Sequence, residues 1–299
     1  MLTVHNFSYG ALTPVLAYLM SFLGSFLGLR CTARSRACTG AARVRWLLVG
    51  AISIGVTGIW VMHFIAMLGF TIPGKIIRYS VPMTVASMLV AVTVVALGLL
   101  IVGFGGVTLR PLLLGGLLTG IGVAAMHYSG MAAMRMSARM SYSPVLFTLS
   151  VVIAIAAATA ALWAALRLRG IRSTLGAAMI MGVAISGMHY TGMAAMRVSP
   201  ADGAPMAMGG ASAEAFLLPL IIGISITTFL LTATVALSPT EDELSADAEL
   251  MRRIESVRAA AGSQLAAPAS GRPSQEGGPL TQALEEYAAR VYAGAAESR

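Results

Sequence analysis

The sequence predicts an all-α membrane protein: a bundle of seven transmembrane helices made of three two-helix repeats and one extra helix, with a short cytoplasmic tail. Composition is the first reason, because 57% of the 299 residues are hydrophobic and 11% are charged, whereas about a quarter of the residues in a soluble domain are charged. Seven apolar stretches of membrane-spanning length are the second. The third is a histidine motif that recurs three times at nearly equal spacing.

The apolar stretches set the expected helices. A bilayer core of about 30 Å requires about 20 mostly apolar residues in each helix, and lipid offers the backbone no hydrogen-bond partners outside the helix. Pro82, Pro111 and Pro144 stand near the starts of three stretches, where the first helical turn accepts proline. We expect the helices at Tyr9–Leu29, Trp46–Phe70, Val81–Phe104, Pro111–Met134, Pro144–Leu166, Thr174–Met196 and Ala215–Leu237.

Charge divides the chain near residue 237. Residues 1–237 carry 14 basic and 2 acidic groups, whereas residues 238–299 carry 6 basic and 10 acidic groups. We therefore expect a membrane domain over residues 1–237 and a tail over residues 238–299. The chain has no basic stripe with interleaved aromatic residues, so nucleic acid is not an expected partner.

The lysine and arginine residues between the helices predict the orientation. One set of connections contains nine of them and the other set contains five. Connections rich in lysine and arginine stay in the cytoplasm, so we expect the set that includes Arg30–Arg45 on that side. The chain is then a multi-pass protein of the plasma membrane, with its N-terminus outside and its C-terminus in the cytoplasm.

The repeated motif places a histidine near the outer end of the second, fourth and sixth helices, so we expect each pair of helices to be one repeat and the seventh helix to be the extra one. Its copies read Met62-His63-Phe64, Met126-His127-Tyr128-Ser129 and Met188-His189-Tyr190-Thr191. Equal spacing predicts three imidazoles at similar depth on one side of the membrane. Gly130 and Gly192 follow their histidines by three residues, and Ala66 takes this place in the first copy. Small residues allow membrane helices to approach closely, as three side chains that share one ligand require.

Histidine and methionine on the same helix faces favour a metal site, because positions i, i+4 and i+7 share a face. Imidazole binds copper, zinc and iron, and soft thioether sulfur favours Cu(I). Polar residues inside a membrane are costly and indicate function. Three histidines would also leave a fourth position open to a small exogenous molecule. The expected copper ligands are His63, His127, His189, Met67, Met131 and Met193, with His5, Met62, Met126, Met188, Met134 and Met196 as further candidates.

Other interpretations stay open. A histidine in a membrane helix can hydrogen-bond a carbonyl group or face a wet cavity, and methionines at helical spacing commonly fill a core. Tyr128 and Tyr190 either lie beside the ligand or anchor their helices at the interface. A protein that holds or delivers copper is one alternative function. Because histidine and methionine are also axial ligands of haem, a haem or copper membrane oxidoreductase is another.

The three copies of the motif resemble the signature of the MHYT domain, a bacterial integral-membrane sensor domain. The third copy matches all four letters, the second departs at the fourth, and the first departs at the third and fourth. The resemblance covers roughly residues 9–237. It implies copper near the outer face, held by the three histidines with Met62, Met126 and Met188 named by the motif, and sensing of oxygen, carbon monoxide or nitric oxide.

The resemblance also bears on the tail, because many such domains carry a cytoplasmic cyclase, phosphodiesterase or kinase. Only 62 residues follow Leu237, so we expect a stand-alone sensor without an enzyme domain, which signals to a cytoplasmic partner. Thr240 and Glu243 have capping-box spacing, which predicts a helix over residues 241–261. Apolar residues at helical spacing predict a short amphipathic helix over residues 280–293.

Overall fold

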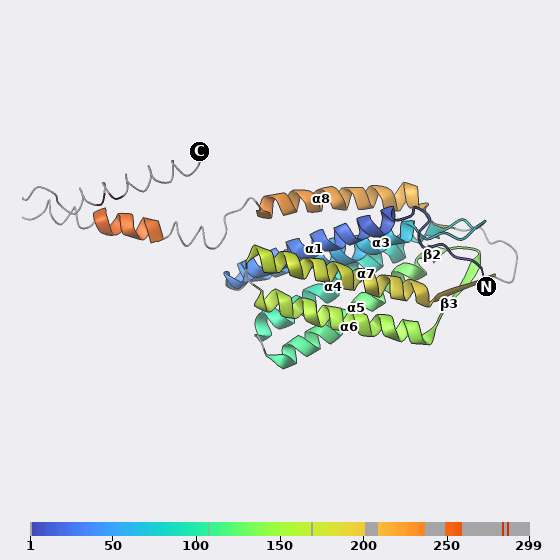
Figure 1. The fold of residues 1–299 in the computed structure, drawn as a ribbon, viewed down its shortest axis with the longest axis horizontal. Helices are drawn as coiled ribbons and strands as arrows, with labels where there is room; N and C mark the ends of the chain where they lie inside the picture. Colours follow the sequence, from blue (N-terminus) through green and yellow to red (C-terminus); the bar gives the residue numbers. More distant parts are fainter. Residues whose placement is uncertain are drawn as a thin grey trace, which may run out of the picture. The chain divides into compact units, whose positions relative to one another are not determined.

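The computed structural model describes residues 2–106, 108–168, 170–200, 209–236 and 249–258, together with residues 283 and 286. The chain divides into two compact units, Met1–Ala236 and Leu237–Arg299. The larger unit is a bundle of long helices that pack side by side (Figure 1). This unit contains the three repeated motifs.

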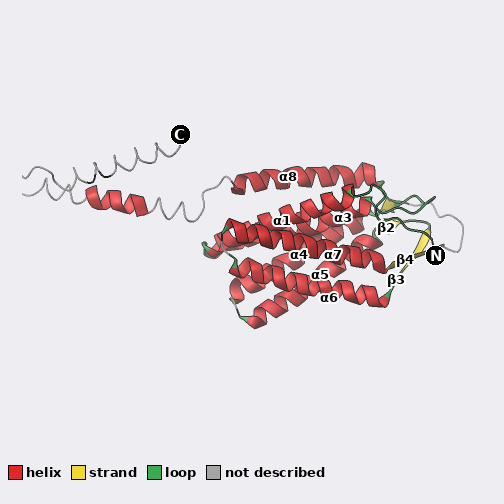
Figure 2. Ribbon diagram, viewed as in Figure 1, coloured by secondary structure: helices red, strands yellow, loops and turns green. Residues whose placement is uncertain are grey.

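Six segments of this bundle are long and apolar enough to cross a membrane, in agreement with the first six expected spans (Figure 2). Five of them are α1 (Leu12–Arg36), α4 (Val81–Gly105), α5 (Leu109–Ala132), α6 (Pro144–Arg167) and α7 (Ile171–Ala195). The remaining segment runs over Gly40–Leu68. It consists of α2 (Gly40–Ile52), the π-helix η1 (Ser53–Val61) and α3 (Met62–Leu68).

The seventh apolar segment is shorter than the other six. The π-helix η2 (Ala213–Leu217) leads into α8 (Leu218–Ala236), which packs against α1 and η1. The apolar helix of this segment, Ala215–Leu231, is below the length of the six spans. The all-α bundle is therefore confirmed with six candidate spans and one shorter apolar helix in place of the expected seventh.

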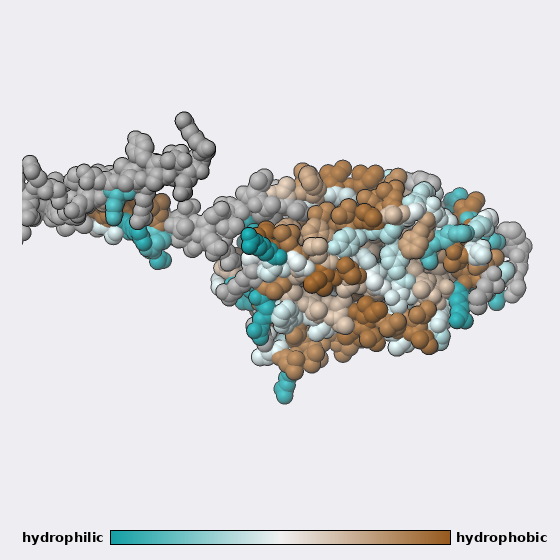
Figure 3. All heavy atoms as spheres, viewed as in Figure 1, coloured by the Kyte–Doolittle hydropathy of each residue, from teal (hydrophilic) through white to brown (hydrophobic). Residues whose placement is uncertain are grey.

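Hydrophilic residues gather at the two ends of the bundle, with an apolar band between them on the face shown in Figure 3. At one end Arg36 donates hydrogen bonds to the carbonyl oxygens of Ala165 (2.8 Å) and Leu168 (2.6 Å) and so joins the last turns of α1 and α6. This distribution of apolar and charged residues is that of a multi-pass membrane protein.

The opposite end carries short strands that the sequence analysis did not anticipate. The N-terminal segment lies beside them, because Leu2 N–H donates to the Val198 carbonyl oxygen at 2.9 Å and His5 pairs with Thr71 through the backbone. Antiparallel pairs form between β1 (Arg78–Tyr79) and β2 (Met134–Arg135), and between β3 (Ala138–Tyr142) and β4 (Met196–Pro200). Backbone hydrogen bonds therefore connect the segments that follow α3, α5 and α7.

Glycine residues set the distance between neighbouring helices. A Cβ on Gly24 of α1 would collide with the backbone of Gly58 in η1, and a Cβ on Gly120 of α5 would collide with the backbone of Ile155 in α6. Such close backbone approach is how membrane helices gain packing energy where lipid removes the hydrophobic driving force between them. The helices that carry the histidines are therefore held close to their neighbours.

The smaller unit contains a helix over its described residues 249–258, within the range expected to be helical. Arg253 Nε lies 3.3 Å from a Glu249 carboxylate oxygen, an exposed i, i+4 ion pair that supports the helix. The capping box at Thr240 and Glu243 lies outside the described residues. So does the amphipathic helix expected over residues 280–293, apart from residues 283 and 286, which are helical.

Candidate metal centre

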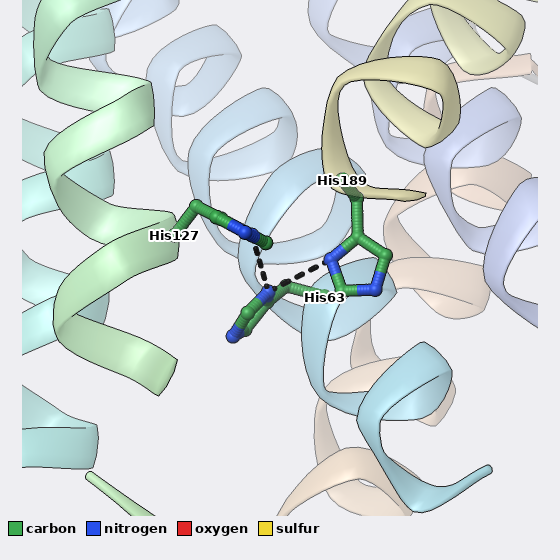
Figure 4. A group of neighbouring side chains, drawn as sticks. All are labelled: His63, His127 and His189. Atoms are coloured by element: carbon green, nitrogen blue, oxygen red, sulfur yellow. Dashed lines mark hydrogen bonds between the residues drawn. The ribbon is translucent and has the colours of Figure 1, made fainter. Parts of the chain in front are cut away.

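Three helices bring the three histidines of the repeated motif together. His63 lies on α3, His127 on α5 and His189 on α7, and all three side chains are buried. Their rings converge, as the equal spacing of the motif predicts (Figure 4). One ligand nitrogen from each residue can be chosen so that the three lie within 4.8 Å of one another. We refer to His63, His127 and His189 as the histidine triad.

The nitrogen atoms that face the centre of the triad are Nδ1 atoms. His63 Nδ1 lies 3.0 Å from His189 Nδ1 and 3.2 Å from His127 Nδ1. The rings are nearly perpendicular to one another, with centroids 4.9–5.0 Å apart and interplanar angles of 79–88°. The triad is thus close to threefold symmetric, although its members come from three separate parts of the chain.

The chemistry of three facing Nδ1 atoms favours a cation between them. A neutral imidazole has one N–H donor and one lone-pair acceptor, so three facing nitrogens cannot all be paired with full donor and acceptor complementarity. Two nitrogens bound to one metal ion at about 2.0–2.1 Å lie about 3.3 Å apart in tetrahedral geometry, close to the observed 3.0 and 3.2 Å. The residues present therefore fit a metal ion, and the triad could hold one.

Glycine residues pack against the outer edges of two of the imidazole rings. A Cβ on Gly130 would lie 2.5 Å from His63 Nε2, and a Cβ on Gly192 would lie even closer to His127 Nε2. Each of these two histidines therefore packs against the small residue of the next copy of the motif. The Nε2 atoms of all three histidines are buried and have no hydrogen-bond partner. The side chains thus present Nδ1 inward, and His63 and His127 present Nε2 to a tight wall of neighbouring helix.

An aromatic ring follows each histidine and contacts it edge-on. The ring centroids of Phe64, Tyr128 and Tyr190 lie 4.8, 4.9 and 5.0 Å from those of the preceding histidines. The Tyr128 hydroxyl hydrogen-bonds the Ser150 hydroxyl at 2.7 Å, whereas the Tyr190 hydroxyl is buried without a partner. Both tyrosines therefore lie beside the triad.

The π-helix η1 leads directly into the His63 segment. Trp60, near its end, donates from Nε1 to the Ser87 hydroxyl (3.0 Å) and to the Thr84 carbonyl oxygen (3.2 Å), both on α4. Its ring also lies against Phe64, with centroids 4.7 Å apart. Stretches of π-helix are rare and are found frequently at functional sites. Here the stretch and its tryptophan fix the part of the span that presents His63.

The other residues expected at the site are placed as follows. His5 is exposed and pairs with Thr71 through its backbone. Among the described residues, the one cluster of histidine, cysteine or acidic side chains that could hold a metal ion is the triad, which does not include His5. Met188 lines an apolar cavity. The methionines expected as ligands or further candidates are all buried: Met62, Met67, Met126, Met131, Met134, Met188, Met193 and Met196. Their role as ligands stays a prediction.

Sequence reasoning missed three parts of this site: the Nδ1 orientation, the walls formed by Gly130 and Gly192, and the buried Trp60 anchor. Small residues three positions after each histidine were visible in the sequence, but their contact is with the imidazole of another copy. The strands above the triad also had a signal, because polar and apolar residues alternate from Met136 to Tyr142.

Comparison with known families agrees with the repeated motif. The family described as "MHYT: Bacterial signalling protein N terminal repeat" matches residues 57–116, 120–178 and 182–246. Each match begins shortly before one histidine of the triad and includes the helix that follows it. We expected the seventh span to be the extra helix, and this division is corrected: α8 falls within the third repeat, and α1 lies outside all three.

Several curated bacterial proteins are similar to this chain. The bifunctional diguanylate cyclase/cyclic di-GMP phosphodiesterase MucR of Pseudomonas aeruginosa is 42% identical over 63% of this chain and 28% of its own length. The cyclic di-GMP phosphodiesterase NbdA of the same organism is 39% identical over 74% of this chain and 28% of its own length. The signaling protein YkoW of Bacillus subtilis is 31% identical over 63% of this chain and 24% of its own length.

The chain thus spans less than a third of the length of these relatives. No solved structure matches it significantly. The three matched repeats cover more than half of the chain, and each includes one histidine of the triad. The chain accordingly belongs to the family of MHYT bacterial signalling proteins.

Proposed function

We propose that this chain is a membrane sensor in which the histidine triad binds a copper ion near the extracytoplasmic face and detects a diatomic gas. The observation that carries the proposal is the convergence of three buried Nδ1 atoms, with 3.0 and 3.2 Å between His63 and its two partners. Buried polar groups inside a membrane persist where they serve a function. Three nitrogen ligands also leave coordination positions open.

Methionine supports copper over zinc. Every methionine of the three motif copies is buried, including Met67, Met131 and Met193, one helical turn beyond the histidines. Thioether sulfur is a soft ligand that suits Cu(I). The three histidines are the proposed primary ligands, and we propose the methionines as further soft donors. Bound copper would supply the open position at which oxygen, carbon monoxide or nitric oxide binds.

A haem is the weaker candidate for this site. Two histidines that ligate one haem iron lie on opposite faces of the macrocycle, which must fit between them. The triad instead holds its facing nitrogens at 3.0 and 3.2 Å, and glycines press on the outer edges of His63 and His127. This arrangement suits a single small ion.

We propose that the triad end of the bundle faces the outside and that the tail, residues 238–299, lies in the cytoplasm. The arginine-rich connections at the opposite end support this orientation, because such connections stay in the cytoplasm. The names of two relatives include the turnover of cyclic di-GMP. We therefore propose a cytoplasmic signalling partner of that kind as the recipient of the signal.

Elemental analysis of anaerobically purified protein tests the proposal. We expect about one copper per chain in the parent and loss of copper in the variant with His63→Ala, His127→Ala and His189→Ala. His5→Ala is the matched control, because His5 is exposed and outside the triad. Circular dichroism verifies that the variants remain helical.

A single His127→Gln variant, which keeps a polar side chain, provides a second measurement if the triple variant does not fold. Equal copper in the parent and in folded triad variants would overturn the assignment, as would zinc in place of copper. Gas sensing is tested by an infrared band of carbon monoxide, which should be present in the copper-loaded parent and in His5→Ala but absent from the triad variants.

A further inference from the structure

An apolar cavity of about 50 Å³ lies within the bundle, between η1, α4, α5, α6 and α7. Its wall includes Ile59, Val123 and Ile185, each of which precedes one histidine of the triad by four residues. One turn of helix is 3.6 residues and rises about 5.4 Å. The cavity therefore begins about one turn from the triad, on the side toward the middle of the bundle.

The chemistry of the wall excludes water as a stable occupant. A buried water molecule needs two to four polar partners, and the wall is apolar except for Thr119. The Thr119 hydroxyl already donates a hydrogen bond to the Val94 carbonyl oxygen at 3.2 Å. Apolar cavities of this kind stay dry and accept apolar molecules or xenon.

General loose packing does not explain the cavity. Gly116 and Gly120 of α5 press against Thr159 and Ile155 of α6, so that a Cβ on either glycine would collide with its neighbour. These two helices nevertheless leave space between them where Ala158 lines the cavity. The volume exceeds the roughly 10–15 Å³ required by one water molecule and suits a molecule of two heavy atoms.

We propose that this cavity is a docking site for a small apolar gas molecule, which enters from the bilayer and is held one helical turn from the triad. The cavity raises the local concentration of the gas where the proposed metal site can use it. Occupancy of the cavity depends only on its wall, whereas its use as a supply to the metal rests on the proposed function.

Xenon is the probe for the cavity, because it is apolar, similar in size to a diatomic gas and independent of any metal. We expect ¹²⁹Xe NMR of the full chain in nanodiscs to show saturable binding. Ala158→Leu fills the cavity and should abolish this binding. Ala156→Leu makes the same change on the exposed side of α6 and should leave it intact. Ala158→Val, a smaller change, serves if the leucine variant does not fold.

Two outcomes would overturn the proposal: an absence of saturable xenon binding in the parent, or equal binding in folded Ala158→Leu. The metal assignment is tested separately by the same samples. Copper without xenon binding refutes the cavity and leaves the metal site standing. Xenon binding in a parent that proves to contain no copper supports the cavity and refutes the proposed metal function.

Discussion

Gly130 lies directly against the imidazole ring of His63, so that a Cβ on the glycine would stand 2.5 Å from His63 Nε2. Gly192 has the same relationship to His127, at an even shorter distance. A side chain at either position must displace an imidazole from its place in the triad. The two glycines are positioning residues for the proposed ligands.

We expect Gly130→Ala or Gly192→Ala to weaken copper binding by about 10–100-fold, the typical effect of disturbing the partners that orient metal ligands. Competition with a Cu(I) chelator measures the change. Gly187→Ala on α7 is the control, because a Cβ there meets no atom within 4 Å. The control should keep full affinity and gain up to about 1 kcal/mol of helix stability. Equal affinities in all three variants would contradict the positioning role.

The two tyrosines beside the triad should respond differently to removal of the hydroxyl. Tyr128→Phe breaks the 2.7 Å hydrogen bond to Ser150 and should lower the free energy of unfolding by about 0.5–1.5 kcal/mol. Tyr190→Phe removes a buried hydroxyl without a partner and should leave stability unchanged or increase it. Unfolding in mixed micelles measures both. A larger loss in Tyr190→Phe than in Tyr128→Phe would refute this difference.

Tyr79 on β1 should make the bundle sensitive to alkali. Burial raises the pKa of the Tyr79 hydroxyl above its ordinary value, which is about 10 in an unfolded chain. The unfolded state therefore loses this proton first, so the contribution to stability is full below about pH 10 and is lost as pH rises toward the folded-state pKa. Tyr79→Phe should flatten the fall in thermal stability above pH 10, whereas Tyr9→Phe, at an exposed ring, should not.

Cysteine labelling tests the proposed orientation. In a background without Cys31 and Cys38, a Ser141→Cys variant on β3 should react with an impermeant maleimide added to intact cells. A Ser274→Cys variant in the tail should react only after the membrane is opened. The reverse pattern would place the triad at the cytoplasmic face and refute the proposed orientation.

The helices and the meeting of the histidines could be predicted because each depends on a local or periodic signal. Long apolar stretches define the six spans, and equal spacing along antiparallel helices brings His63, His127 and His189 to one depth. Nothing local in the sequence sets the rotamers that turn Nδ1 inward, since that depends on contacts such as Gly130 with His63. The π-helix over Ser53–Val61 likewise depends on packing against α1 and α4.

Backbone pairing at the triad end of the bundle joins the segments that follow α3, α5 and α7 and the N-terminal segment into a closed ring. The chain leads from Thr71, after α3, to β1, which pairs with β2. It continues from β2 to β3, which pairs with β4. Val198 of β4 then pairs with Leu2, and His5 pairs with Thr71, which closes the ring. A shift of α3, α5 or α7 along its axis would therefore strain the backbone hydrogen bonds of this ring. These pairs link the ends of the three histidine-bearing helices, and we expect a displacement of one helix to be transmitted to the other two.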